Sequence, residues 1–432
     1  MPSHRMATRV PGWPIALQDN PLPSRTARVS RGDRDGHPHV TLGMRHHIRP
    51  PPGRVRFAFV PAACGHAREC VIVKRPASVL ITGGAGFIGC ALAQSLLDRG
   101  ATVSVLDTLH PQVHAVLGRP PRLPAGAQLL TGDVTHAEDW QTVLRLVRPH
   151  TIVHLAAETG TGQSLTEAGR HGAVNVLGTC RMLDALLHAG AVPEHIVLAS
   201  SRAVYGEGAW QSDGVVFHPG QRTRHDLQAG RWDPPGPDGA PASPVPSRAD
   251  VTVPRPISVY GATKLAQEHI LGAWAGATGC ALSVLRLQNV YGPGQSLTNP
   301  YTGVVTLFAQ VASRGGVIDV YEDGAIVRDF VFIDDVVGAL DRAVASPPAG
   351  RRVLDIGSGR STTIAELARS VAGIVGAPAP EVSGRFRDGD VRAASCDIEP
   401  AVRALELGPT WEVGAGLLAL IEWMHHQAEA GA

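Results

Sequence analysis

The 432-residue chain lacks any cysteine pattern that would build a disulfide framework or a zinc site. No two of its cysteines form a C-x-x-C pair, and the six are scattered along the chain: Cys64, Cys70, Cys90, Cys180, Cys280 and Cys396. Isolated cysteines in a chain of this length are typical of reduced thiols in a cytoplasmic protein. We therefore expect a cytoplasmic location and no metal site.

Long apolar runs and a strong net charge are also missing. Without 18 consecutive apolar residues, no membrane-spanning helix is expected, and a net charge of +1 gives no indication of nucleic-acid binding. The charges are nevertheless uneven, because residues 1–75 hold 13 Lys and Arg against 4 Asp and Glu, and the remainder holds 26 against 34. This aperiodic leader, rich in Arg, Pro and His, is predicted to be a disordered basic extension. A transit peptide or a nucleic-acid arm is the alternative to a plain tail.

From Ser78 onward, short apolar runs alternate with stretches of helical periodicity. The expected strands are 78–82, 102–106, 129–130, 151–155, 195–199 and 282–285, and the longer helices are 87–99, 166–188 and 260–277. Alternation of this kind predicts an α/β fold, with a doubly wound parallel Rossmann sheet covered by helices on both faces. We place this domain at residues 76–296.

Two regions depart from the alternation. A stretch rich in Gly, Pro and Asp at about 207–253 is too long for an ordinary connection and is predicted to be a structured insertion or a lid. Residues 297–432 are expected to form mainly a smaller C-terminal lobe that binds substrate. Its expected helices are 301–314, 334–345, 362–375 and 411–425, and its expected strands are 317–320 and 327–332.

A glycine-rich loop, Gly83-Gly84-Ala85-Gly86-Phe87-Ile88-Gly89, follows the first strand and opens a helix. Such a loop places backbone N–H groups and a helix N-terminus against a dinucleotide pyrophosphate. Gly83 would permit the tight turn, Gly86 the close approach of the pyrophosphate, and Gly89 the packing of helix against strand. The loop therefore predicts a dinucleotide cofactor.

An acidic residue at the end of the second strand indicates which dinucleotide binds. Asp107 stands 24 residues after Gly83, where a carboxylate can accept hydrogen bonds from both ribose hydroxyls and would repel a 2′-phosphate. NAD is therefore expected rather than NADP. Further candidate cofactor residues follow the third and fourth strands: Asp133, Val134, Leu155, Ala156 and Ala157.

Tyr260 and Lys264 stand four residues apart at the start of a helix and so share one face. A tyrosine with a pKa of roughly 10 is a weak base at neutral pH, but a neighbouring ammonium group lowers its pKa. The same lysine would hydrogen-bond the nicotinamide ribose. Ser201, after the fifth strand, would bridge Tyr260 and the reacting oxygen. These three residues predict redox chemistry on a hydroxyl group, whereas a surface Tyr/Lys pair is the alternative.

In this order, these motifs resemble the extended short-chain dehydrogenase/reductase family of sugar-nucleotide epimerases and dehydratases. The resemblance covers about residues 76–426 and implies a Rossmann domain, a small substrate lobe and a tightly held NAD that is regenerated in each cycle. It also implies a nucleotide-diphosphate sugar as substrate and a homodimer formed through the helices at 166–188 and 260–277. The substrate-binding residues that it implies are Asn289, Asn299, Arg328 and Arg387.

The residues around Ser201 bear on the reaction type. Dehydratases of the family carry Thr-Asp-Glu where this chain has Ser201-Arg202-Ala203, so the acid and base needed to eliminate water are missing. The resemblance therefore implies epimerisation, with a 4-ketoreductase or plain dehydrogenase as the alternative. A non-catalytic NAD-binding regulator would be expected to lack the Ser, Tyr or Lys.

Three further segments, 111–114, 229–234 and 295–303, resemble the dTDP-L-rhamnose 4-epimerases of this family. That resemblance implies conversion of dTDP-L-rhamnose into dTDP-6-deoxy-L-talose. UDP-glucose 4-epimerase remains an alternative. The insertion of this chain contains no cysteine, unlike that of many such relatives, which argues against a metal-binding role.

Overall fold

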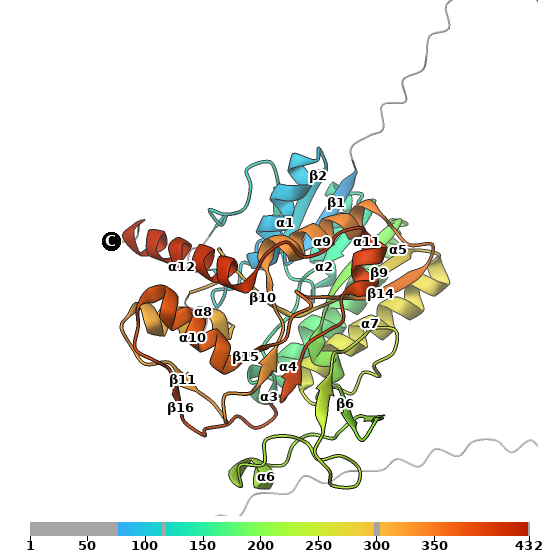
Figure 1. Cartoon of the computed structure of the whole chain (residues 1–432). Coiled ribbons are helices and arrows are strands. Elements are labelled where there is room, and N and C mark those ends of the chain that lie inside the picture. Colours follow the sequence, from blue (N-terminus) through green and yellow to red (C-terminus); the bar gives the residue numbers. More distant parts are fainter. Residues whose placement is uncertain (1–76, 115–117, 298–302, 431–432) are drawn as a thin grey trace, which may run out of the picture. The chain divides into compact units, whose positions relative to one another are not determined.

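The structure, a computed structural model, describes residues 77–114, 118–297 and 303–430. The predicted extension at 1–75 and the predicted substrate residue Asn299 lie outside the described residues. A parallel seven-stranded sheet runs through the described chain (Figure 1). Its strands, in spatial order, are β14 (Arg351–Ile356), β9 (Ala281–Leu287), β5 (His195–Ser201), β4 (Thr151–His154), β1 (Ser78–Thr82), β2 (Thr102–Asp107) and β3 (Gln128–Thr131).

The strand order reverses direction beside β1. From β1 the chain adds β2 and β3 on one side, and then returns to place β4, β5, β9 and β14 on the other. Loops that leave β1 and β4 therefore diverge, which opens a crevice at the carboxyl ends of these two strands. The predicted doubly wound Rossmann sheet is confirmed.

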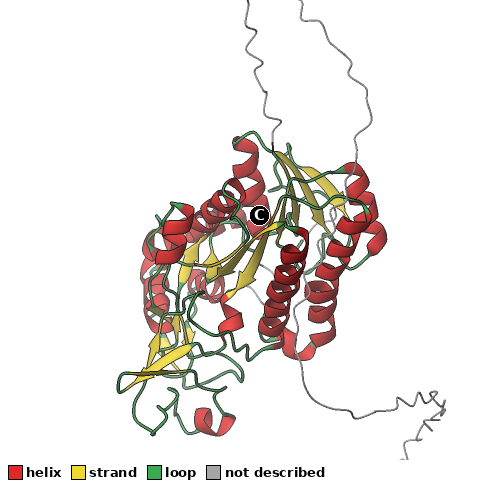
Figure 2. Cartoon of the chain, turned by 90° about the vertical axis from the view of Figure 1, so that its right-hand side faces the viewer, coloured by secondary structure: helices red, strands yellow, loops and turns green. Residues whose placement is uncertain are grey.

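Helices cover both faces of the sheet, as Figure 2 shows. Side chains alternate along each strand, so Val79 and Ile81 enter one core while Leu80 enters the other. The first core includes α1 (Phe87–Asp98) and α9 (Ile333–Ala345), and the second includes α2 (Ala137–Leu146), α5 (Gly178–His188) and α7 (Val259–Thr278). This double coverage explains why the strands read as continuous apolar runs.

The seventh strand, β14, comes from the region that the sequence assigned mainly to the substrate lobe. Its sequence begins with two arginines and contains Asp355, so it has no continuous apolar run. Asp355 is nevertheless buried, because its carboxylate accepts hydrogen bonds from the hydroxyl of Tyr205 at 2.8 and 3.0 Å. The chain thus returns to the Rossmann sheet after residue 297, and α9 packs against α1.

The predicted insertion has structure of its own. It contains an antiparallel sheet in the order β7-β6-β8. Its elements, after a 3-10 turn at Arg202–Tyr205, are β6 (Ala209–Ser212), β7 (Val215–Phe217), α6 (Arg224–Gln228) and β8 (Ser243–Val245).

The C-terminal lobe, which the sequence predicts to bind substrate, contains short strands and several helices. The single strand expected at 327–332 is divided at Asp329, whose buried carboxylate accepts hydrogen bonds from the backbone of Ser358 and Gly359. The two halves therefore pair with different partners. The elements are β10 (Asn289–Tyr291), α8 (Val304–Ser313), β11 (Asp319–Val320), β12 (Val327–Arg328), β13 (Phe330–Phe332), β15 (Thr362–Thr363), α10 (Ile364–Val375), β16 (Glu381–Val382), β17 (Ala393–Ala394), α11 (Glu399–Leu405) and α12 (Val413–Ala430).

The helix expected at 166–188 is also divided. It consists of α3 (Gln163–Thr166), α4 (Ala168–His171), a π-helical turn at Gly172–Leu177, and α5. None of the helices in the described ranges is long and apolar enough to cross a membrane.

Candidate active site

The glycine loop lies at the carboxyl end of β1 and is closely surrounded by backbone. Gly83 has a φ of +65°, and its N–H donates to the carbonyl of Leu106 at 2.7 Å. A Cβ atom on Gly83 would lie 2.7 Å from the backbone nitrogen of Ala156, and one on Gly89 would lie 2.4 Å from the Cα of Gly84. Both positions therefore require glycine, because a side chain would overlap fixed backbone.

Gly86 is placed differently. It is the residue before α1, and a Cβ atom there would meet just one atom within 4 Å, the carbonyl oxygen of Gly83 at 3.3 Å. Its open side and the N-terminus of α1, which begins with Phe87 and Ile88, can receive a pyrophosphate. The cradle left by these glycines fits a dinucleotide.

Asp107 ends β2 beside this loop. Its Oδ2 accepts the N–H of Ala85 at 3.0 Å, and its Oδ1 accepts the N–H of Leu109 at 2.9 Å. The two bonds fix the carboxylate at the sheet edge while leaving lone pairs for ribose hydroxyls. The position fits NAD, as the sequence predicted.

The other predicted cofactor residues share this edge of the sheet. Asp133 is turned toward Thr135, whose N–H and hydroxyl both donate to its Oδ1 at 2.8 Å. Val134 is buried, and its carbonyl accepts the indole N–H of Trp140 at 2.9 Å. Beyond β4, the N–H of Leu155 donates to the carbonyl of Thr82 at 3.0 Å, and Ala156 and Ala157 are partly exposed.

Ser201, Tyr260 and Asn289, three residues far apart in the sequence, line one cavity of about 220 Å³. The buried Oδ1 of Asn289 has no hydrogen-bond partner within the described part of the chain. The full lining is Gly160, Thr161, Ser201, Arg202, Ala203, Tyr260, Gln288, Asn289, Val290, Tyr291, Gly303, Val304, Val305 and Phe330. The cavity combines a hydroxyl, a phenol and an amide with apolar walls, which is suited to a polar ligand such as a sugar.

The start of α7 brings Tyr260 to Ser201. Ser258 caps the helix by accepting the N–H of Gly261 at 3.1 Å. A Cβ atom on Gly261 would lie 2.5 Å from the carbonyl oxygen of Ala203, so glycine allows the helix to approach the turn that follows Ser201. Ser201 and Tyr260 are hydrogen-bonded through their side chains.

Burial changes the acid–base properties of the catalytic candidates. It raises the pKa of Tyr260, although the hydrogen bond with Ser201 and the charge of Arg202 act in the opposite direction. Burial also lowers the pKa of Lys264, one turn further along α7, to about 7, and the carboxylate of Glu268 opposes this shift. A buried lysine with so low a pKa is a frequent feature of active sites.

Two buried polar residues behind the catalytic candidates were not among the predicted site residues. Asn175, in the π-helical turn, accepts the N–H of Glu158 at 2.8 Å and donates to the hydroxyl of Thr263 at 2.9 Å. π-Helical turns often mark functional sites. The one feature of the sequence that could have indicated this residue was an asparagine within an apolar helical pattern. The second residue, His154, is fully buried and contacts the hydroxyl of Thr82 at 2.7 Å.

The two predicted diphosphate arginines lie outside the cavity lining. Arg328 is buried and donates to the Asp390 carboxylate at 2.7 Å. Arg387 is exposed, with its guanidinium carbon 5.2 Å from the centre of the Tyr321 ring. The structure thus brings together Ser201, Tyr260 and Asn289, but it does not place either arginine against them.

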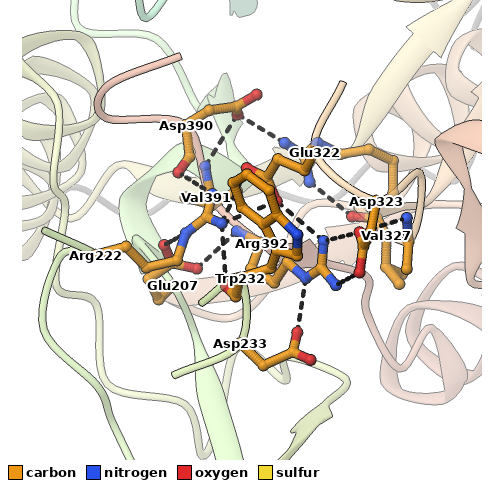
Figure 3. Close-up of polar contacts among 12 residues, drawn as sticks. Glu207, Arg222, Trp232, Asp233, Glu322, Asp323, Val327, Asp390, Val391 and Arg392 are labelled. Atoms are coloured by element: carbon orange, nitrogen blue, oxygen red, sulfur yellow. Dashed lines mark hydrogen bonds and ion pairs between the residues drawn. The ribbon is translucent and has the colours of Figure 1, made fainter. Parts of the chain in front are cut away.

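A buried ionic cluster joins the insertion to the lobe (Figure 3). We call it the bridging cluster, and it consists of Glu207, Arg222, Glu322, Asp390 and Arg392. Arg222, from the insertion, pairs with Glu207 at 3.2 Å and with Glu322 at 2.9 Å, and it donates to the carbonyl of Asp390 at 2.9 Å. The Arg392 side chain pairs with Glu322 at 2.9 Å, and the backbone N–H of Arg392 donates to the Glu207 carboxylate at 2.8 Å. The cluster therefore holds the segment that carries Asp390, the partner of Arg328.

Residues 79–226 and 235–357 match the model of the NAD dependent epimerase/dehydratase family. Among curated proteins, a dTDP-L-rhamnose 4-epimerase from Burkholderia thailandensis is 53% identical over 352 residues, which cover 81% of this chain and 96% of that protein. A UDP-glucose 4-epimerase from Mycolicibacterium smegmatis is 30% identical, with coverage of 81% and 99%.

Solved structures show the same similarity. The UDP-glucose 4-epimerase of Thermotoga maritima with UDP-glucose matches with a TM-score of 0.67 and 28% identity. The Thermus thermophilus UDP-glucose 4-epimerase in complex with NAD matches with a TM-score of 0.64 and 28% identity. Each comparison covers 81% of this chain and 99% of the other.

Proposed function

Since the chain belongs to the NAD dependent epimerase/dehydratase family, we propose that it converts dTDP-L-rhamnose into dTDP-6-deoxy-L-talose by epimerisation at C4. The observation that carries this proposal is the cavity shared by Ser201, Tyr260 and Asn289. The 53% identity to the Burkholderia enzyme supports the choice of the sugar and of the nucleobase.

Family membership also confirms several predictions from the sequence. The chain is an NAD-dependent enzyme of the extended short-chain dehydrogenase/reductase type, and its cofactor is NAD. The non-catalytic regulator is thereby set aside. The roles of individual residues remain proposals.

We propose that Tyr260, as phenolate, removes the proton from the sugar 4-hydroxyl and later returns it. When bound, NAD supplies the acceptor for the C4 hydride and gives it back to the opposite face of the sugar. Ser201, hydrogen-bonded to Tyr260, stabilises the charge that develops on O4. Lys264, one turn along the same helix, is proposed to hold Tyr260 and the nicotinamide ribose.

The same site argues against dehydration. Arg202 and Ala203 line the cavity directly after Ser201, and neither can serve as the acid and base that an elimination requires. In the proposed epimerisation the hydride leaves one face of the sugar and returns to the opposite face. The sugar must therefore turn in the cavity while the nucleotide stays fixed. Asn289, Asn299, Arg328 and Arg387 are proposed to hold the substrate during this turn.

A substrate screen tests the function. The purified protein is first analysed for bound NAD, and is then given dTDP-L-rhamnose or UDP-glucose without added cofactor, with the products followed by NMR. We expect NAD to co-purify and dTDP-L-rhamnose to be epimerised. A requirement for stoichiometric NADH would instead identify a reductase, and a preference for UDP-glucose would contradict the proposed sugar.

Replacement of the proposed base tests the mechanism. We expect Tyr260→Phe to lower kcat by roughly 10³-fold, because general base catalysis contributes about 10²- to 10⁴-fold, while NAD remains bound. The matched control is Tyr321→Phe, which makes the same change outside the cavity and keeps the ring that faces Arg385 and Arg387. Rates near those of the wild type in Tyr260→Phe would refute the assignment.

We further propose that the enzyme is a cytoplasmic homodimer. Leu177 and Leu187, exposed along the predicted dimer helix, support an interface there. Free thiols at Cys90, Cys180, Cys280 and Cys396 support a reducing compartment. Sedimentation velocity measures the oligomeric state, and cell fractionation measures the location.

A further inference from the structure

Arg202 is a charged side chain of the cavity to which no role has yet been given. It follows Ser201 directly, is partly buried, and lines the same cavity as Tyr260 and Asn289. Its guanidinium makes no hydrogen bond and no ion pair within the ranges that the structure describes. Four buried arginines nearby each pair with a carboxylate: Arg222, Arg286, Arg328 and Arg392.

The carboxylates that act on Arg202 are already bound to other groups. Arg328, Asp390, Tyr260 and Glu207 all interact electrostatically with its guanidinium. Of the two carboxylates, Asp390 already binds Arg328 at 2.7 Å, and Glu207 belongs to the bridging cluster. Burial, with help from Arg328, lowers the pKa of Arg202 to about 10, so the side chain still carries its charge at neutral pH.

An arginine placed in this way is suited to an anionic ligand. A partly buried cation without a partner is unfavourable in the empty protein, and a guanidinium binds phosphate oxygens through two parallel hydrogen bonds. Arg202 interacts electrostatically with both Tyr260 and Arg328. In a nucleotide sugar, the reacting hydroxyl and the β-phosphate lie at opposite ends of one sugar ring, so a single ligand in this cavity would offer a hydroxyl for Tyr260 and an anion for Arg202.

We propose that Arg202 binds the β-phosphate of the nucleotide sugar, next to Arg328, and thereby holds the sugar within reach of Tyr260. This proposal rests on the proposed function only in requiring a nucleotide-diphosphate sugar. It assigns Arg202 to substrate binding, whereas the comparison with the Thr-Asp-Glu triplet of the dehydratases argued only against elimination of water.

The experiment measures the affinity for diphosphates against that for monophosphates. Binding of dTDP and dTMP to the NAD-containing enzyme is followed by calorimetry for the wild type, Arg202→Gln and Arg202→Lys. We expect Arg202→Gln to weaken dTDP binding by about 10- to 100-fold and dTMP binding much less. We expect Arg202→Lys to recover part of the loss, because it keeps the charge but not the planar fork.

The control variant is Arg145→Gln, which makes the same charge change at an exposed position on α2 and should bind dTDP as the wild type does. Retained NAD in each variant shows that the cofactor domain is folded. If Arg202→Gln binds dTDP normally, or if Gln and Lys weaken dTDP and dTMP equally, the β-phosphate assignment is wrong. Parallel titrations with UDP and UMP separate this outcome from an error in the proposed nucleobase. If the nucleobase were wrong, the enzyme would prefer uridine nucleotides to thymidine nucleotides, but it would still bind the diphosphate more tightly than the monophosphate.

Discussion

The cofactor side and the substrate side of this enzyme are held together in different ways. On the cofactor side, the glycine loop follows β1 and Asp107 ends β2, two largely buried strands of the central sheet. Both are fixed by hydrogen bonds from the backbone. The insertion and the lobe contain strands of two to four residues, and buried ion pairs of the bridging cluster join them. The predicted cofactor site is thus built by backbone geometry, whereas the insertion and the lobe, which are proposed to bind the substrate, are joined by side-chain charges.

Removal of one arginine from the bridging cluster should have the largest effect on stability. Arg392→Met removes the guanidinium that pairs with Glu322, Asp323 and Asp233, and breaking a buried ion pair costs about 3 to 5 kcal/mol. We expect a free energy of unfolding lower by about 3 kcal/mol and a raised KM for the nucleotide sugar, with bound NAD retained at 25 °C. Urea unfolding and steady-state kinetics measure both quantities.

The control for this prediction is Arg385→Met in the same lobe. Arg385 pairs with Asp319 at 2.7 Å, but its side chain is 66% exposed, so the change should cost less than about 1 kcal/mol. Equal losses of unfolding free energy in Arg392→Met and Arg385→Met would show that burial does not decide the strength of these ion pairs. Loss of NAD from Arg392→Met at 25 °C would show that the two sides are not energetically separate.

A change in the glycine loop should affect the cofactor side of the enzyme. In Gly89→Ala the new Cβ would lie 2.4 Å from the Cα of Gly84, so the loop must shift. We expect a cost of about 2 to 3 kcal/mol and loss of co-purified NAD. The control is Gly276→Ala in α7, where a Cβ meets nothing within 4 Å and helix propensity should add about 0.5 to 1 kcal/mol. Retention of NAD by Gly89→Ala would show that the tight packing is not required.

The smallest effect concerns pH. Burial lowers the pKa of His154 to about 3, and the charge of Lys264 contributes. Between pH 6.5 and 3 the unfolded chain binds a proton that the folded chain does not, so stability should fall as the pH falls through this window. His154→Gln should cost about 1 to 2 kcal/mol at pH 7.5 and should show a weaker loss of Tm at pH 5. His188→Gln, at an exposed position, is the control, and parallel Tm curves for His154→Gln and the wild type would refute the assignment.

The sequence predicted the cofactor side in more detail than the substrate side. The roles predicted for Gly83, Gly89 and Asp107 rest on the number of residues that separate them from the ends of neighbouring strands, and that number can be counted in the sequence. By contrast, β14 was missed because Asp355 interrupts its apolar pattern, and the partner that permits its burial, Tyr205, lies 150 residues away. The π-helical turn around Asn175 was missed because its hydrogen bonds reach Glu158 and Thr263, outside the local helical pattern.

The sequence by itself determined the Rossmann sheet and the NAD cofactor, since strand periodicity and short motif spacings are local properties. On the same grounds it predicted the Ser201, Tyr260 and Lys264 constellation, which stays a prediction. The tertiary structure decided which side chains share the cavity and which charges remain unpaired. Arg222 of the insertion pairs with Glu322 of the lobe, and Arg392 of the lobe pairs with Asp233 of the insertion. Arg202 finds no such partner among the described residues. Charge compensation depends on contacts between residues far apart in the chain, and those contacts exist only once the chain has folded.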